Sequence, residues 1–284
     1  MNYACRICIA IFVLCNVLFA SQLQQKVQKL IPNNIYQANL KFIQKIFANE
    51  KAFYRDNDID VVKVISALKS NGLLSLKLTK PSNVSVTFRL NAIRQTDKNP
   101  SFTFLAYSAS NILSSIGYSY FYVTEATKAD SKITLTYTLN SESNIDPIVM
   151  TTNLARRGYK IIDVNRYSAT QWIYDISLIN SNIVAAKTLT KGTNTLTQIN
   201  GKYWLTFTDI GTLQITPKDN ADAWYPKILI FDNNMNPLNV IMLTDSKTAY
   251  TIDLPIATRH VLITDNYNPN ILRNGLNIDF TPAR

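Results

Sequence analysis

The chain is poor in the residue types on which most enzyme sites depend. Its 284 residues include seven glycines, three cysteines and a single histidine, His260. No two glycines lie within eight residues of each other, which excludes the glycine-rich loops that wrap backbone amides around a phosphate. A zinc site normally recruits several cysteine and histidine ligands, so one histidine cannot build a typical one. We therefore expect no cofactor and no metal site.

The cysteines are confined to the first fifteen residues, as Cys5, Cys8 and Cys15. This segment has the order of a secretory signal peptide, with Arg6, an apolar run over residues 8–19, and small residues that allow cleavage after Ala20. The run is too short for a membrane-spanning helix, which needs roughly 20 apolar residues, so an uncleaved anchor is the weaker alternative. We expect a cleaved signal peptide over residues 1–20 and a mature chain without cysteine or a transmembrane span.

Export without cysteine favours the bacterial periplasm. Small extracellular eukaryotic domains usually depend on disulfides, whereas a chain of this length buries enough apolar surface to fold without them. The net charge of +10 suits either an anionic envelope surface or general solubility. No basic run is dense enough to indicate nucleic acid as a partner.

Residues 21–57 predict a helical segment that Pro32 interrupts. Its apolar stripe, formed by Ile35, Phe42, Ile43, Ile46 and Phe47, suits packing on the rest of the fold or a docking arm.

Residues 58–182 predict three consecutive units of one helix and two strands, over 58–91, 100–140 and 145–180. Each helix is expected to end at a glycine, namely Gly72, Gly117 and Gly158. Asp58 and Asp146 are the expected N-caps of the first and third helices. The predicted strands are 73–79 and 84–90, 118–123 and 132–139, and 159–164 and 172–178.

The strand 132–139 has the clearest pattern. Apolar Ile133, Leu135, Tyr137 and Leu139 alternate with Lys132 and three threonines, which is typical of a half-buried antiparallel strand. We therefore expect antiparallel sheets with helices on one face.

After residue 182 the pattern changes to short, closely spaced strands without helical periodicity. The predicted strands are 184–190, 203–208, 212–216, 227–231, 239–243, 249–254, 259–264 and 276–280. The predicted fold class is therefore α+β, with an N-terminal helical segment, three αββ repeat modules with antiparallel sheets, and a C-terminal all-β sandwich over residues 183–284.

Three aromatic residues in predicted loops are the candidate ligand-binding residues: Trp224, Tyr225 and Tyr267. Exposed rings beside Asp and Asn side chains can stack on a sugar and hydrogen-bond its hydroxyls, whereas the alternative for each ring is core packing. Arg156, Arg157 and Lys160 form a cationic group that suits either an anion or the C-terminus of a helix.

No catalytic residue is predicted. A Ser-His-Asp triad would have to use His260, which lies in a predicted strand. Nothing near it resembles a nucleophile motif, so we expect His260 to be a surface or partly packed side chain. Carboxylate hydrolysis by the loop residues Asp219, Asp222, Asp232 and Asp265 is a weak third option. Asp232 also begins a calcium-like spacing that the following residues do not complete, which favours a plain hairpin turn.

The sequence thus favours an exported, periplasmic, non-enzymatic protein, an adaptor or assembly factor that binds envelope proteins in a cell-envelope machine. Strand addition to a sheet edge is one testable mode of binding. The alternative is a glycan- or peptidoglycan-binding protein that acts through the C-terminal sandwich.

Overall fold

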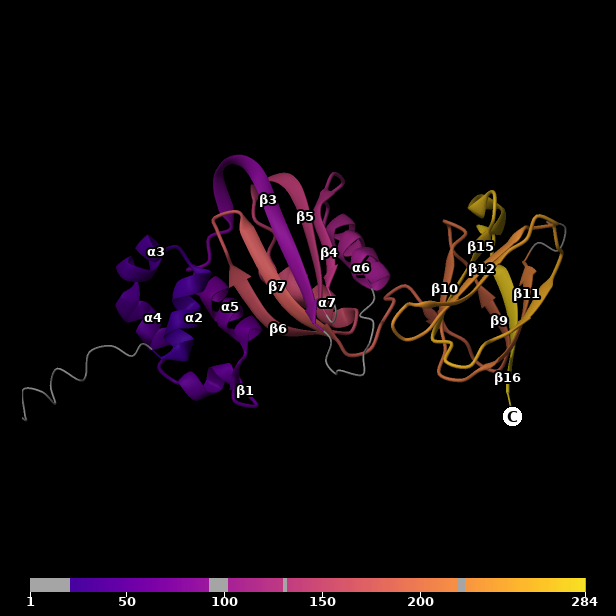
Figure 1. Cartoon of the computed structure of the whole chain (residues 1–284), viewed down its shortest axis with the longest axis horizontal. Helices are drawn as coiled ribbons and strands as arrows, with labels where there is room; N and C mark the ends of the chain where they lie inside the picture. The colour runs from indigo at the N-terminus through magenta and orange to yellow at the C-terminus, as the bar shows by residue number, and fades with distance from the viewer. Residues whose placement is uncertain (1–20, 92–101, 130–131, 219–222, 284) are drawn as a thin grey trace, which may run out of the picture.

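The computed structural model describes residues 21–91, 102–129, 132–218 and 223–283. The predicted signal peptide lies outside these residues. The described chain is an α+β protein, as predicted, with N-terminal helices, a central sheet and a C-terminal all-β region (Figure 1).

The N-terminal region consists of short helices. They are α2 (Gln22–Leu30), α3 (Asn33–Ala38), α4 (Leu40–Ile46) and the 3₁₀ helix η1 (Glu50–Phe53). The Ser21 hydroxyl accepts a hydrogen bond from the amide of Gln24 and so caps α2, and Pro32 separates α2 from α3. Ile43 and Phe47 of the predicted stripe are buried, whereas Phe42 is 45 % exposed. The stripe therefore packs on the rest of the fold along part of its length.

The three predicted helices are present as α5 (Val61–Ser70), α6 (Phe102–Ser115) and α7 (Pro147–Arg156). Each helix is followed by a glycine with positive φ: Gly72, Gly117 and Gly158. This conformation commonly ends helices, and glycine adopts it without the steric penalty that a Cβ would bring.

The predicted cap of α7 is confirmed, and that of α5 is wrong. Asp146 accepts the amide of Ile148, but α5 is capped by Asp60 rather than Asp58. Asp58 belongs instead to a small hairpin of β1 (Tyr54–Arg55) and β2 (Asp58–Ile59), which the sequence pattern did not indicate.

The central sheet has the strand order β4-β5-β3-β7-β6. Its strands are β3 (Lys77–Asn91), β4 (Tyr122–Ala129), β5 (Lys132–Ser143), β6 (Tyr159–Arg166) and β7 (Gln171–Leu178). All neighbours are antiparallel except β3 and β7, which are parallel. The prediction of purely antiparallel sheets is therefore wrong.

The first unit also differs from the prediction, because one long strand, β3, replaces the expected pair of strands. The segment between the two predicted strands, which contains Pro81, is accommodated by a shift in the pairing of β3 with β5 between Lys77 and Ser82. Proline is tolerated at such irregularities because one backbone donor is already unpaired there. The second unit's first strand also begins later than predicted, at Tyr122.

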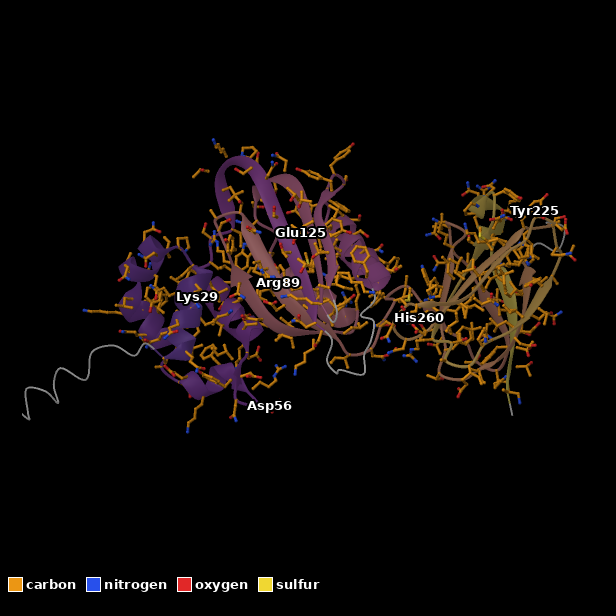
Figure 2. All side chains as sticks on the ribbon, viewed as in Figure 1. Lys29, Asp56, Arg89, Glu125, Tyr225 and His260 are labelled. Atoms are coloured by element: carbon orange, nitrogen blue, oxygen red, sulfur yellow. The ribbon has the colours of Figure 1, made fainter. Side chains whose placement is uncertain are left out.

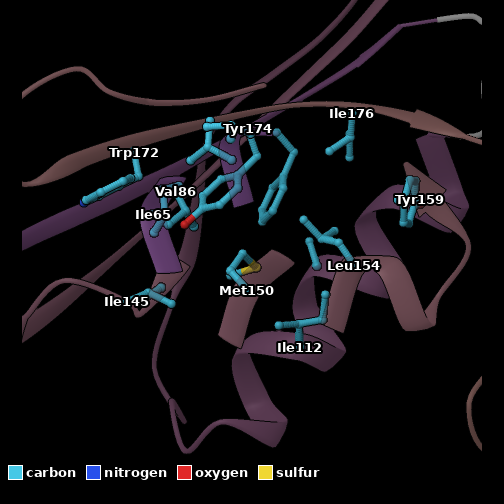
Figure 3. Close-up of a cluster of buried hydrophobic side chains, with 14 of the residues drawn as sticks. Ile65, Val86, Ile112, Ile145, Met150, Leu154, Tyr159, Trp172, Tyr174 and Ile176 are labelled. Atoms are coloured by element: carbon cyan, nitrogen blue, oxygen red, sulfur yellow. The ribbon is translucent and has the colours of Figure 1, made fainter. Parts of the chain in front are cut away.

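The two faces of the central sheet have opposite chemistry. Val86, Phe88 and Tyr174 are fully buried on the face that packs against the helices, and Figure 3 shows Tyr174 in one cluster with Ile65 of α5 and Met150 of α7. On the other face hydroxyl groups pair across strands, as in Ser85 with Thr138 and Thr87 with Thr136, both at 2.9 Å. This pairing satisfies the polar groups of the face within the sheet itself.

The C-terminal region consists of two sheets that share one core. One sheet has the order β13-β12-β15-β10-β8 and the other β14-β11-β16-β9. The strands are β8 (Lys187–Thr188), β9 (Gly192–Leu196), β10 (Tyr203–Thr206), β11 (Gly211–Pro217), β12 (Pro226–Phe231), β13 (Pro237–Met242), β14 (Tyr250–Asp253), β15 (His260–Asp265) and β16 (Leu276–Pro282). Each of the eight predicted strands overlaps an observed one. The sequence pattern missed β9, which carries no buried residue.

Gly158 and Gly117 provide a matched test of the close backbone contact between the end of α7 and Asn180, which follows β7. A Cβ at Gly158 would overlap the carbonyl oxygen of Asn180, whereas a Cβ at Gly117 meets nothing within 4 Å, although both residues have positive φ. Gly117→Ala should cost about 1 kcal/mol through the backbone conformation alone, and Gly158→Ala about 3 kcal/mol or more. Denaturant unfolding measures both, and equal losses would show that the Asn180 contact imposes no constraint.

Candidate functional site

A cleft of about 860 Å³ lies beside β6, at one edge of the central sheet. Its walls come from four elements that are distant in sequence: the β1–β2 hairpin, the first turns of α5, the second half of α7 and the beginning of β6. Its apolar lining includes Ile59, Val61, Val62, Ala155, Ile161 and Ile162. A volume of this size is within the usual range of ligand sites in proteins.

Charged residues surround this apolar lining. On the hairpin side Arg55 forms an ion pair with Asp60 at 2.7 Å, and Asp60 also accepts the amide of Lys63. Asp56 and Asp58 extend from the same hairpin, and Figure 2 shows Asp56 at its tip. The acidic hairpin therefore uses one carboxylate for structure and leaves two at the rim.

The other side of the cleft is basic. Arg156 at the end of α7 and Lys160 in β6 both line it, and neither side chain has a partner among the described residues. Arg157 does not join them: it is buried and donates to the carbonyl of Asn153 at 3.1 Å, and burial lowers its pKa. Of the three cations noted in the sequence, the structure thus brings two to a common cleft. The opposing wall, from α5 and the hairpin, had no signal in the sequence.

The far half of β6 is covered by α2. Lys26 of α2 reaches β6, with its ammonium group 2.5 Å from Asp163 and 3.0 Å from Asn165. Burial lowers the pKa of Lys26, and the Asp163 carboxylate opposes that effect. Only the first half of β6 therefore borders the cleft.

The opposite edge of the central sheet is β4. All eight residues of β4 are exposed, and within the described chain β4 pairs only with β5. The edge carries large apolar side chains, because Tyr122 is 56 % and Val123 48 % exposed, and Tyr120 just before it is 90 % exposed. An irregularity in the pairing falls between Val123 and Glu125.

The three aromatic candidates lie in different environments. Trp224 is fully buried in the C-terminal core, so its ring is not accessible to a ligand in this structure. Tyr267 is 62 % exposed and contacts half-buried Tyr225 edge to face, with ring centroids 4.9 Å apart. Buried Asp265 fixes this pair by accepting the amides of both tyrosines at 2.7 and 2.8 Å. Figure 2 shows Tyr225 at the end of the C-terminal region remote from the central sheet.

His260 is fully buried at the junction of the two halves of the protein. Its Nε2 lies 2.8 Å from the Ser181 hydroxyl, in the connection between the halves, and its Nδ1 lies 3.0 Å from the Thr206 hydroxyl. Both His260 and its neighbour Val261 are fully buried, so the expectation of a surface or partly packed histidine is wrong. Tyr107 of α6 packs on Trp204 of the C-terminal region close by, at 5.7 Å between ring centroids.

The remaining candidates are a metal centre and the loop aspartates named from the sequence. No group of three or more His, Cys, Asp or Glu in them is arranged to hold a metal ion. Asp232 caps its own turn by accepting the amides of Asn234 and Asn236, both at 2.8 Å. Asp265 accepts the amides of Tyr225 and Tyr267, as described above. Asp219 and Asp222 lie outside the described residues. Among the helices described, none combines the length and the apolar character that a membrane crossing requires.

Comparisons of the chain with protein-family models, with curated proteins and with solved structures find no match. The two edges of the central sheet, the cleft beside β6 and the Tyr225–Tyr267 pair are the surfaces from which a function can be proposed.

His260 should make stability depend on pH. Burial, assisted by Arg259, lowers its pKa from 6.5 to about 4 in the folded protein. The unfolded chain therefore binds a proton that the folded protein excludes, and stability falls as the pH drops from about 6.5 to about 4, by at most about 3 kcal/mol.

Urea unfolding between pH 6.5 and 4.5, where most aspartates remain ionised, measures this effect. His260→Gln should be less stable at pH 7 but should vary less with pH than the natural protein. Parallel pH profiles for the two proteins would contradict the assignment.

Proposed function

We propose that this protein is a non-enzymatic adaptor that binds an extended segment of a partner protein along β4. The observation that carries the proposal is the exposure of all eight β4 residues at an edge with no second pairing strand in the described chain. An edge strand presents unpaired amide and carbonyl groups, and an extended segment that pairs with them gains main-chain hydrogen bonds.

The side chains of β4 favour recognition rather than protection of the edge. Natural edges are commonly protected by charge, proline, a bulge or a covering loop, and in β4 the pairing irregularity comes only after Val123. In β4 the first half carries Tyr122 and Val123, whereas charged side chains such as Glu125 occur further along. Exposed aromatic and β-branched side chains contribute contact area to a strand partner, which supports binding at this half of the edge.

We also propose that the protein acts in the periplasm. The signal-peptide pattern over residues 1–20 and the absence of cysteine after Cys15 favour a periplasmic protein in a cell-envelope machine. Within this proposal α6–β4–β5 and α7–β6–β7 are copies of one repeated module, and α5–β3 is a shortened first copy with one strand instead of two. The two C-terminal sheets form a β-sandwich.

Site-specific photocrosslinking in cells tests the β4 edge. A photoreactive side chain at the start of the β4 edge, in place of the 90 % exposed Tyr120, should yield discrete protein adducts, whereas the same group at Asn200, in a C-terminal turn, should not. Tyr122→Lys with Val123→Lys should reduce the adducts, because lysine opposes edge pairing, while changing stability by only about 0.5 kcal/mol. Equal adducts from both positions, or none from β4, would exclude this edge as the binding site.

The alternative function, glycan binding, is favoured by one observation, the exposed Tyr267 ring held against Tyr225. Under this alternative Tyr267→Ala should weaken retention on immobilised peptidoglycan without loss of stability. Trp224→Ala should instead lower stability by about 3–5 kcal/mol, because its ring fills the C-terminal core. Pull-down and thermal unfolding of both variants separate the two roles, and unchanged retention in Tyr267→Ala would remove the alternative.

A further inference from the structure

We propose that the cleft beside β6 is a second binding site, for an extended peptide that carries carboxylate groups. This site lies at the opposite edge of the central sheet from β4, and the two proposals stand on separate observations.

The first half of β6 provides the main-chain wall of this site. Residues 159–162 line the cleft, while β7 pairs with the other side of the strand. No strand of the described chain pairs with β6 on its cleft side. Lys26 of α2 covers the strand from Asp163 onward, so an added segment is limited to about four residues, or about 13 Å of extended chain.

The apolar lining of the cleft suits alternate side chains of such a segment. Ile59 and Val62 on one side and Ile161 and Ile162 on the other provide the apolar surface. Because successive side chains of an extended chain point in opposite directions, every second residue of the peptide would contact this lining. The intervening residues would then lie at the charged rim.

The charges of the rim define the chemistry of the ligand. Arg156 and Lys160 lie on the α7 and β6 side, and neither has a partner among the described residues. Two further cations line the opposite wall, and both are already engaged: Arg55 pairs with Asp60, and the ammonium group of Lys63 lies over the Phe53 ring, 5.8 Å from its centroid. Carboxylates of a bound peptide would therefore lie next to α7 and β6.

The two carboxylates of the hairpin limit where the acidic side chains of a bound peptide can lie. Asp56 and Asp58 belong to the hairpin wall and would repel a carboxylate placed there. An acidic peptide is thus attracted to one wall and repelled from the other, which selects one placement in the cleft. The N-terminal segment of the chain itself is a poor occupant, because residues 1–20 contain no aspartate or glutamate.

Fluorescence anisotropy with short labelled peptides tests the proposal on the mature protein. The probes are three end-blocked hexapeptides that alternate valine with glutamate, glutamine or lysine. The glutamate peptide should bind most tightly and the lysine peptide least. Arg156→Glu combined with Lys160→Glu should weaken binding of the glutamate peptide about tenfold or more.

A matched double variant controls for net charge. Lys202→Glu combined with Arg273→Glu changes the charge equally at exposed positions of the C-terminal region and should leave binding unchanged. Amide hydrogen exchange should show that the glutamate peptide protects residues 159–162 and not β4. Tyr122→Lys with Val123→Lys should also bind the glutamate peptide normally, so failure of the β4 proposal is distinguishable from failure of this one.

Three results would overturn the proposal: no binding of the glutamate peptide, equal binding of the glutamate and lysine peptides, or equal weakening by both double variants. The last result would show that the peptide responds only to overall charge.

Discussion

The central position of β3 is the constraint on which the rest of the structure depends. Because β3 pairs antiparallel with β5 on one side and parallel with β7 on the other, it joins two helix–hairpin units into a single sheet. One apolar face of that sheet then packs against α5, α6 and α7, with Val86 and Phe88 of β3 fully buried. Without this strand each hairpin would be a two-stranded sheet, which is marginally stable at best in water.

The same arrangement determines where a partner has access to the sheet. With β3 in the middle, the first strand of each hairpin, β4 or β6, is left at an edge. The two edges have become different surfaces, because β4 is exposed along its whole length while β6 is divided between the cover of α2 and the cleft. A partner that adds to β4 and one that enters the cleft would therefore contact surfaces of different chemistry.

The junction with the C-terminal region depends on buried polar contacts as well as apolar packing. His260 is bonded at both ring nitrogens, to Ser181 of the connection and to Thr206 of β10, and its burial favours the neutral ring. Because each nitrogen has a hydroxyl partner, the neutral imidazole can donate from one and accept at the other without leaving a buried polar atom unpaired. Tyr107 and Trp204 add aromatic contact across the same junction.

Local sequence patterns determined much of the secondary structure, because apolar periodicity, caps and helix-ending glycines act within a few residues. The helices that end before Gly72, Gly117 and Gly158 could be predicted on that basis. The strand β5 could be predicted as well, but not that Thr136 and Thr138 on its polar face would also be buried. The parallel pairing of β3 with β7, the burial of His260 and the cleft could not, because each brings together segments far apart in the chain. Arg156 and Lys160 illustrate the limit: the sequence shows two nearby cations, and only the tertiary structure places an acidic hairpin and an apolar lining beside them.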